Sequence, residues 1–228
     1  PLATEVVVRE RARFAGASHV LYGVAILGSA FLLFFVQPMV GKRVIPLFGG
    51  APGVWTLCLA FFQSVLFLGY AYAHALHRFV SPAMQLVVHS TLVLAAASVA
   101  VVLDEAGWGV AVGDAPTLAI LRLLTVHIGL PFFVLASTGP LVQAWYARRH
   151  PSSSPYPLYA LSNAGSFLAL FAYPFLVEPR LGVLETMSNW SIGFLVTGAL
   201  VLVCALMARR GARSGEVAEE VAPISSSR

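Results

Sequence analysis

The stretch FAGASHVLYGVAILGSAFLLFFVQPMVG, residues 14–41, contains no Asp, Glu, Lys or Arg. A helix of about 20 apolar residues spans the roughly 30 Å hydrocarbon core of a bilayer, so this stretch is long enough to cross one. Five further uncharged stretches of similar length occur at residues 44–76, 79–103, 123–147, 151–177 and 186–208. The sequence therefore predicts an all-α polytopic membrane protein, a bundle of six transmembrane helices.

Composition excludes several other classes of protein. Mean hydropathy is +0.82 and only 11% of residues are charged, against about 25% in a soluble domain. The formal net charge of +4 comes from basic residues at the ends of apolar stretches, where they direct topology and do not indicate nucleic acid. Cys58 and Cys204 lie inside apolar stretches without a CxxC motif, so no disulfide framework is expected.

The distribution of basic residues predicts that both termini are cytoplasmic. We expect a cytoplasmic N-terminal segment at 1–17, a six-helix domain at 18–208 and a polar tail or linker at 209–228. Pro131 and Pro140 lie inside the fourth helix and predict a kink or break there. No internal repeat is evident along the chain. The inside segments contain Arg9, Arg11, Arg13, Arg78, Arg148, Arg149, Arg209, Arg210 and Arg213.

Lys42 and Arg43 break the topology rule, because they fall in the first outside loop. The glycines that follow do not form a dinucleotide fingerprint, since no acid lies about 20 residues beyond them. Either the two cations hold an anion, a lipid headgroup or a partner domain, or they reach headgroups from the end of the first helix.

Small and polar residues mark the fifth helix. The spacings Ser162–Ser166 and Gly165–Ala169 allow close helix approach, with serine and Asn163 hydrogen-bonding across the contact. Alternatively, polar side chains within the spans line a substrate path. The candidates for such a path are Gln37, Gln63, His127, Gln143 and Asn163.

Catalytic and metal-binding patterns are absent from the sequence. There is no HExxH motif and no carboxylate deep inside an apolar stretch. His74 and His89 fall at similar predicted depth, which leaves a bis-histidine haem as a minor alternative. We expect no catalytic residue, no cofactor and no metal.

Several motifs together resemble the membrane portion of bacterial fused major-facilitator/spermidine-synthase-like proteins. That resemblance implies a half-major-facilitator-like fold in the bacterial cytoplasmic (inner) membrane, joined to a soluble aminopropyltransferase-like domain. No such domain is present here, so the chain is not expected to be an enzyme. The motifs lie at residues 35–46, 49–55, 62–63, 69–74, 129–133, 137–145, 157–166 and 173–179.

The first expectation for function is a non-catalytic membrane module, an anchor, scaffold or subunit of a larger assembly. Its interaction or packing residues would be Gln37, Lys42, Arg43, Trp55 and Asn163, and its partners the lipid bilayer and another protein or membrane half. The alternative is half of a transporter that forms a small-molecule path, polyamine being one option, with a second six-helix unit. That path would be lined by Gln63, His127, Gln143 and Asn163.

Overall fold

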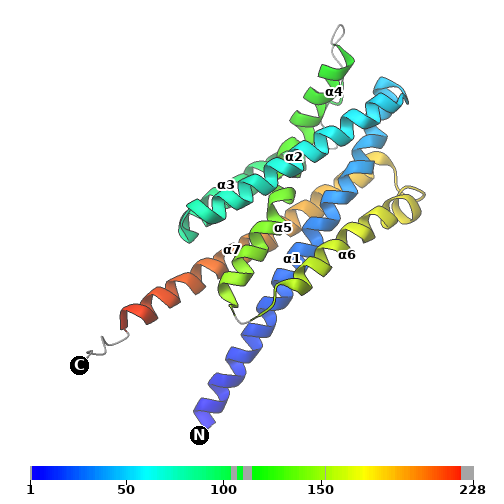
Figure 1. Ribbon diagram of the computed structural model, residues 1–228. Coiled ribbons are helices and arrows are strands. Elements are labelled where there is room, and N and C mark those ends of the chain that lie inside the picture. The colour runs from blue at the N-terminus through cyan, green and yellow to red at the C-terminus, as the bar shows by residue number, and fades with distance from the viewer. Residues whose placement is uncertain (1, 104–106, 110–114, 152, 222–228) are drawn as a thin grey trace.

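The computed structural model describes residues 2–103, 107–109, 115–151 and 153–221. All regular elements in these ranges are helical (Figure 1). In chain order they are α1 (Leu2–Phe48), α2 (Pro52–Phe79), α3 (Pro82–Val101), α4 (Pro116–Leu124), the π-helical turn η1 (Thr125–Gly129), α5 (Leu130–Arg149), α6 (Tyr156–Ala172), the π-helical turn η2 (Tyr173–Val177) and α7 (Val183–Val221).

Six stretches of helix in the described ranges are long and apolar enough to cross a membrane, which confirms the expected number. The start of α1 and the end of α7 lie at the same end of the bundle (Figure 1). We name this end the termini end and the opposite one the far end. The spans are Gly16–Phe48, Pro52–Phe79, Pro82–Val101, Pro116–Arg149, Tyr156–Val177 and Val183–Arg209.

Prolines and tight turns set where the helices begin and end. Pro52, Pro82 and Pro116 each open a helix, where the missing N–H costs nothing and the fixed φ suits the helix. Gly49, with φ of 79°, follows the last residue of α1 in the left-handed conformation that commonly ends a helix. Ser81 caps α3 by accepting a hydrogen bond from a backbone N–H of its first turn.

The fourth span departs from regular helix at Pro131 and not at Pro140. The π-helical turn η1 ends at Gly129, two residues before Pro131, because proline cannot donate to the carbonyl one turn back and the chain pairs differently there. α5 continues through Pro140, so the break predicted at that position is wrong. η2 repeats the arrangement around Pro174.

Both ends of the chain are more helical than expected. The segment expected at 1–17 belongs to α1 from Leu2 onward, and α7 continues through the expected tail to Val221. Alanine, arginine and glutamate, which are strong helix formers, make up much of both segments. The remaining residues of the expected tail, 222–228, lie outside the described ranges.

The spans pack in two layers. The first layer has the order α2, α5, α1, α6, with α2 packed mainly on α5 and α6 mainly on α1 (Figure 1). α3 and α7 pack on each other and cover one side of this layer, against α5 and α1. The apolar core lies between the layers and contains Phe62, Phe132, Trp190 and Phe194. The other side of the first layer, the four-helix face, is not covered by a described helix.

The absence of a repeat expected from the sequence is corrected by the packing, in which α2 lies on α5 as α6 lies on α1, and α3 lies on α5 as α7 lies on α1. When α1 is aligned with the fourth span, the same or similar residues recur 106 positions apart. The two spans cross in opposite directions, so the repeat is inverted. The equivalent pairs are Gly23 and Gly129, Ala30 and Ala136, Val36 and Val142, Gln37 and Gln143, Lys42 and Arg148, and Arg43 and Arg149.

The packing of two glycines agrees with this repeat. A Cβ on Gly165 of α6 would lie 2.5 Å from the Leu27 carbonyl oxygen of α1, and a Cβ on Gly69 of α2 would lie 3.2 Å from the Phe133 carbonyl oxygen of α5. Leu27 and Phe133 are also 106 positions apart. Each repeat therefore contributes a glycine that brings its second helix onto the first helix of the other repeat.

Candidate functional site: a polar groove on the four-helix face

Three adjoining cavities open along the four-helix face. From the termini end to the far end their volumes are about 510, 210 and 660 Å³. Tyr70, Ser162 and Asn163 are among the residues that line both the first and the second cavity, and Phe34 lines both the second and the third. The cavities therefore form one continuous feature, named the polar groove below.

Hydroxyl and carboxamide groups line the middle of the polar groove, at membrane depth. Ser29, near the middle of the first span, is buried and donates to the Ile26 carbonyl at 3.0 Å, and Ser166 donates to the Ser162 carbonyl at 3.0 Å. Asn163 is exposed on the groove and makes no hydrogen bond to another described residue. Unpaired polar groups are costly in contact with lipid, so this face is suited to water or to another polypeptide.

The inverted repeat places one glutamine at each end of the polar groove. Gln143 lines the cavity at the termini end, and its equivalent, Gln37, lines the cavity at the far end. Each side chain is half-buried and free of hydrogen bonds to the rest of the described chain. One carboxamide therefore faces the groove from each repeat.

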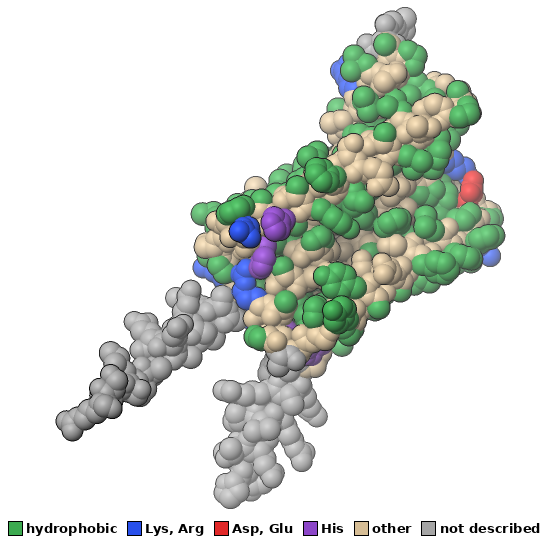
Figure 2. Space-filling view, viewed as in Figure 1, with side chains coloured by type: hydrophobic (Ala, Val, Ile, Leu, Met, Phe, Trp, Pro, Cys, Tyr) green, Lys and Arg blue, Asp and Glu red, His purple; other side chains and the backbone are tan. Residues whose placement is uncertain are grey.

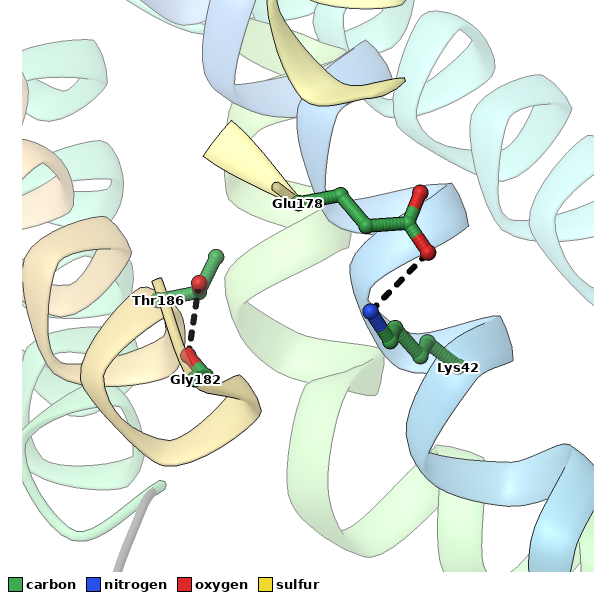
Figure 3. Close-up of polar contacts among 4 residues, drawn as sticks. All are labelled: Lys42, Glu178, Gly182 and Thr186. Carbon is green, nitrogen blue, oxygen red and sulfur yellow. Dashed lines mark hydrogen bonds and ion pairs between the residues drawn. The ribbon is translucent and has the colours of Figure 1, made fainter. Parts of the chain in front are cut away.

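An ion pair between two lining residues borders the far-end cavity. Lys42 Nζ of α1 lies 2.9 Å from Glu178 Oε1, at the end of η2 (Figure 3). The lysine side chain is 39% exposed and the glutamate side chain 41% exposed. The neighbouring bond in Figure 3, from the Thr186 hydroxyl to the Gly182 carbonyl at 2.8 Å, belongs to the start of α7. We name the Lys42–Glu178 contact the far-end clasp.

A second contact joins the equivalent helices at the termini end. Arg148 Nη2 of α5 lies 2.9 Å from His77 Nδ1 of α2. Because the guanidinium always donates, Nδ1 must accept, and His77 is the neutral tautomer with its proton on Nε2. We name this contact the termini-end clasp. On the face shown in Figure 2, histidine side chains gather at this end, basic side chains are visible at both ends, and an acidic side chain is visible only at the far end.

Three of the residues expected to contact a partner make contacts within the chain. Lys42 forms the far-end clasp, and the Arg43 guanidinium lies 6.0 Å from the centre of the Trp108 ring. Trp55 lines the far-end cavity and packs on Gly41, where a Cβ would lie 2.5 Å from the indole. These positions assign the three side chains to packing and clasping of the far end.

Of the four residues expected to line a path, the structure brings two together. Gln143 and Asn163 line the same cavity. Gln63 is exposed on α2 and lines none of the three cavities, and His127 lies in η1 with its ring 4.6 Å from that of Trp108. His127 Nδ1 is 2.8 Å from the Leu123 carbonyl oxygen. His127 therefore faces the packing at the far end and not the groove.

Close approach of α6 to α1 was expected through small residues, and the structure confirms it. Gly165 and Ala169 are buried, with Gly165 against the backbone of α1. Asn163 faces the groove and makes no bond across this contact, so its expected hydrogen-bonding role is wrong. Close backbone approach and side-chain packing, such as that of Leu161 on Gly23, join the two helices there.

The two histidines considered for haem have different surroundings. His89 is fully buried, with its ring 5.8 Å from Trp145 and 6.1 Å from Tyr72, whereas His74 is exposed on α2. Trp145 donates to Gln85 Oε1 at 2.9 Å in the same packed region. Within the described residues no group of three or more His, Cys, Asp or Glu side chains is placed to hold a metal.

A further histidine pair lies where α1 meets the end of α5. His19 Nδ1 is 2.8 Å from the Tyr146 hydroxyl, and the rings of His19 and His150 are 4.3 Å apart. Burial lowers the pKa of His150, and the nearby His19 and Arg149 lower it further. His150 therefore resists protonation in the folded protein.

Sequence reasoning missed Ser29 and Tyr70, and it assigned Ser162 and Ser166 to packing only. Ser29 lies between glycine and alanine, a context that carries no functional signal. The offset of 106 positions was the available signal for the site, because it pairs the two groove glutamines, Gln37 and Gln143.

Comparison of the chain with protein-family models, curated proteins and solved structures finds no match.

Proposed function

We propose that this chain is one six-helix half of a membrane transport unit. In this proposal the polar groove forms a small-molecule path against a second six-helix unit that covers the four-helix face. The observation that carries the proposal is the row of polar side chains, including Ser29, Gln143 and Asn163, at membrane depth on that face. Lipid is a poor solvent for such groups, whereas a path or a helical partner accommodates them.

The inverted repeat supports the same proposal. Secondary transporters commonly contain inverted repeats, with the binding site near the middle of the membrane where the repeats meet. Here the meeting helices are α1 and α5, and both line the middle cavity. The chain itself is proposed to be non-catalytic. An anchor, scaffold or subunit packed on a partner, the other function expected from the sequence, would also cover these polar groups, but it would exclude water from the groove.

Orientation follows from the basic side chains at the termini end. Arg78, Arg148, Arg149 and Arg209 end their spans at this side of the bundle. By the positive-inside rule we propose that the termini end faces the cytoplasm. We propose a multi-pass protein of a bacterial inner membrane, in line with the family that the motifs resemble.

The proposal is tested by the water accessibility of single cysteines. In a Cys58→Ala, Cys204→Ala background, Asn163→Cys on the groove is compared with Leu94→Cys, a position 63% exposed on α3 outside the three cavities. A small, uncharged, water-soluble thiol reagent reacts with the thiolate, which forms in water and not in hydrocarbon. We expect labelling of Asn163→Cys about tenfold or more faster than of Leu94→Cys. Equal rates would contradict the transport proposal.

A further inference from the structure

The lining of the polar groove carries no net charge in the part of the chain that the structure describes. Among the side chains that line its three cavities, the charged ones are Lys42 and Glu178, which neutralise each other at 2.9 Å. The middle and termini-end cavities are lined by neutral groups. A charged solute would lose hydration there without meeting an opposite charge, which is strongly unfavourable.

Three carboxamides in the groove have unused hydrogen-bonding capacity. Gln37, Gln143 and Asn163 make no hydrogen bond to another described residue. Each offers two N–H donors and a carbonyl acceptor. A hydroxyl group both donates and accepts, so a solute with several hydroxyls can use both kinds of group on each carboxamide.

Aromatic rings lie beside these carboxamides at both ends of the groove. Tyr70 and Tyr159 line the termini-end cavity with Gln143, and Trp55 and Tyr173 line the far-end cavity with Gln37. The rings supply flat apolar surfaces with polar edges. The C–H faces of a polyol can pack on such surfaces while its hydroxyls bind the carboxamides.

From this lining we infer that the polar groove takes small, uncharged, polyhydroxylated solutes. Gln37 and Gln143 are the equivalent specificity-determining contacts at its two ends. The inference rests on the proposed transport function and names its substrate class. It disfavours a polyammonium substrate, because among the described lining residues the carboxylate is that of Glu178, which Lys42 already neutralises.

The test is thermal unfolding of the full chain in detergent over concentration series of glycerol, mannitol, sucrose and spermidine. A bound solute raises Tm along a saturable curve, whereas exclusion of a polyol from the protein surface raises it without saturation. We expect a saturable rise with at least one polyol and none with spermidine. If no polyol gives a saturable rise, or if only spermidine does, the inferred substrate class is wrong.

Matched variants separate the groove from general effects of the solute. Gln143→Leu and Gln37→Leu should each raise the half-saturating polyol concentration about tenfold, since a hydrogen-bonding contact is lost. Leu94→Gln, outside the groove, should leave it unchanged. Gln143→Glu keeps the shape of the side chain and adds a charge, so it should weaken polyol binding and introduce spermidine binding. Unchanged half-saturation in both Gln143 variants would overturn the role of this residue.

Failure of this inference is distinguishable from failure of the proposed function. If Asn163→Cys reacts quickly with the uncharged reagent but no polyol binds, the path stands and the substrate class is wrong. If Asn163→Cys reacts no faster than Leu94→Cys, both are overturned.

Discussion

The two clasps occupy equivalent places at opposite ends of the molecule but differ in chemistry. The far-end clasp joins α1 to the end of η2 through Lys42 and Glu178, and the termini-end clasp joins α5 to α2 through Arg148 and His77. Lys42 and Arg148 are related by the inverted repeat, and both contacts are 2.9 Å long. The inverted repeat therefore determines which helices are joined at each end. The partner residue determines whether salt or acid breaks the contact.

The difference in partners predicts different responses at the two ends. A carboxylate–ammonium pair keeps its charges near neutral pH but is screened by salt when it is exposed. A neutral imidazole that accepts from arginine is lost as an acceptor when it is protonated, and salt affects it less. We expect the far end to respond mainly to ionic strength and the termini end mainly to pH.

The largest loss of stability is expected from substitutions at Gly165 and Gly69, where helices of the two repeats are in contact. Alanine at either position would place Cβ 2.5 Å from a backbone oxygen or 2.7 Å from the Cβ of Ala136, so each variant should lose about 1–3 kcal/mol of stability. Gly139→Ala is the control, because nothing lies within 4 Å of its Cβ position. Unfolding midpoints in detergent provide the measurement. Loss at only one of the two glycines would argue against equivalent packing of the repeats.

The next largest effect is an increase, at acid pH, in the distance between α2 and α5 at the termini end. Protonation of His77 removes the acceptor for Arg148, a hydrogen bond worth about 1 kcal/mol. Spin labels at Ala75 and Ala147 should move apart as the pH is lowered below about 6.5, the ordinary pKa of histidine, while labels at Leu47 and Leu176 across the far end should not. Equal movement of both pairs would show that the two clasps are not chemically distinct.

A smaller loss of stability is expected when the far-end clasp is removed. Both side chains are substantially exposed, so Glu178→Gln should cost about 0.2–1 kcal/mol at low salt. The difference from the unmodified protein should vanish in about 1 M NaCl, where charges are screened. Arg148→Met serves as the comparison, since its cost should persist at high salt. A salt-independent cost for Glu178→Gln would assign Glu178 a role other than pairing.

The smallest effect is expected on the pH dependence of stability, through His150. Its pKa is lowered in the folded protein, so the unfolded chain binds the proton more readily. The stability from neutral His150 is present above the unfolded pKa of about 6.5 and is lost as pH falls toward the lower folded value. His150→Gln should therefore flatten the decline in denaturation midpoint on acidification. An unchanged slope would show that His150 does not contribute to it.

Sequence alone predicted the class of fold because it depends on properties that are local to each span. Uncharged length indicates a membrane-crossing helix whatever its neighbours are, and the small residues around Gly165 indicated close packing. Pro131 indicated the departure from regular helix, while Pro140 showed that the same residue type is accommodated within a continuous α5.

The candidate site was less predictable because it depends on which faces of distant helices meet. Gln143 and Asn163 were expected to lie on one path, and they share a cavity. Gln63 and His127 were grouped with them by polarity alone, but side-chain direction around each helix sends them elsewhere. The partner of Lys42, Glu178, is 136 positions away, which no local pattern indicates.

The most direct test of the polar groove as a path uses Gln37→Cys and Gln143→Cys in the background without native cysteines. Each is exposed to a membrane-impermeant thiol reagent in right-side-out and in inside-out vesicles. We predict that Gln143→Cys reacts from the cytoplasmic side and Gln37→Cys from the opposite side, because the inverted repeat places them at the two ends of one groove. Reaction of both from the same side, or of neither from any side, would contradict this account.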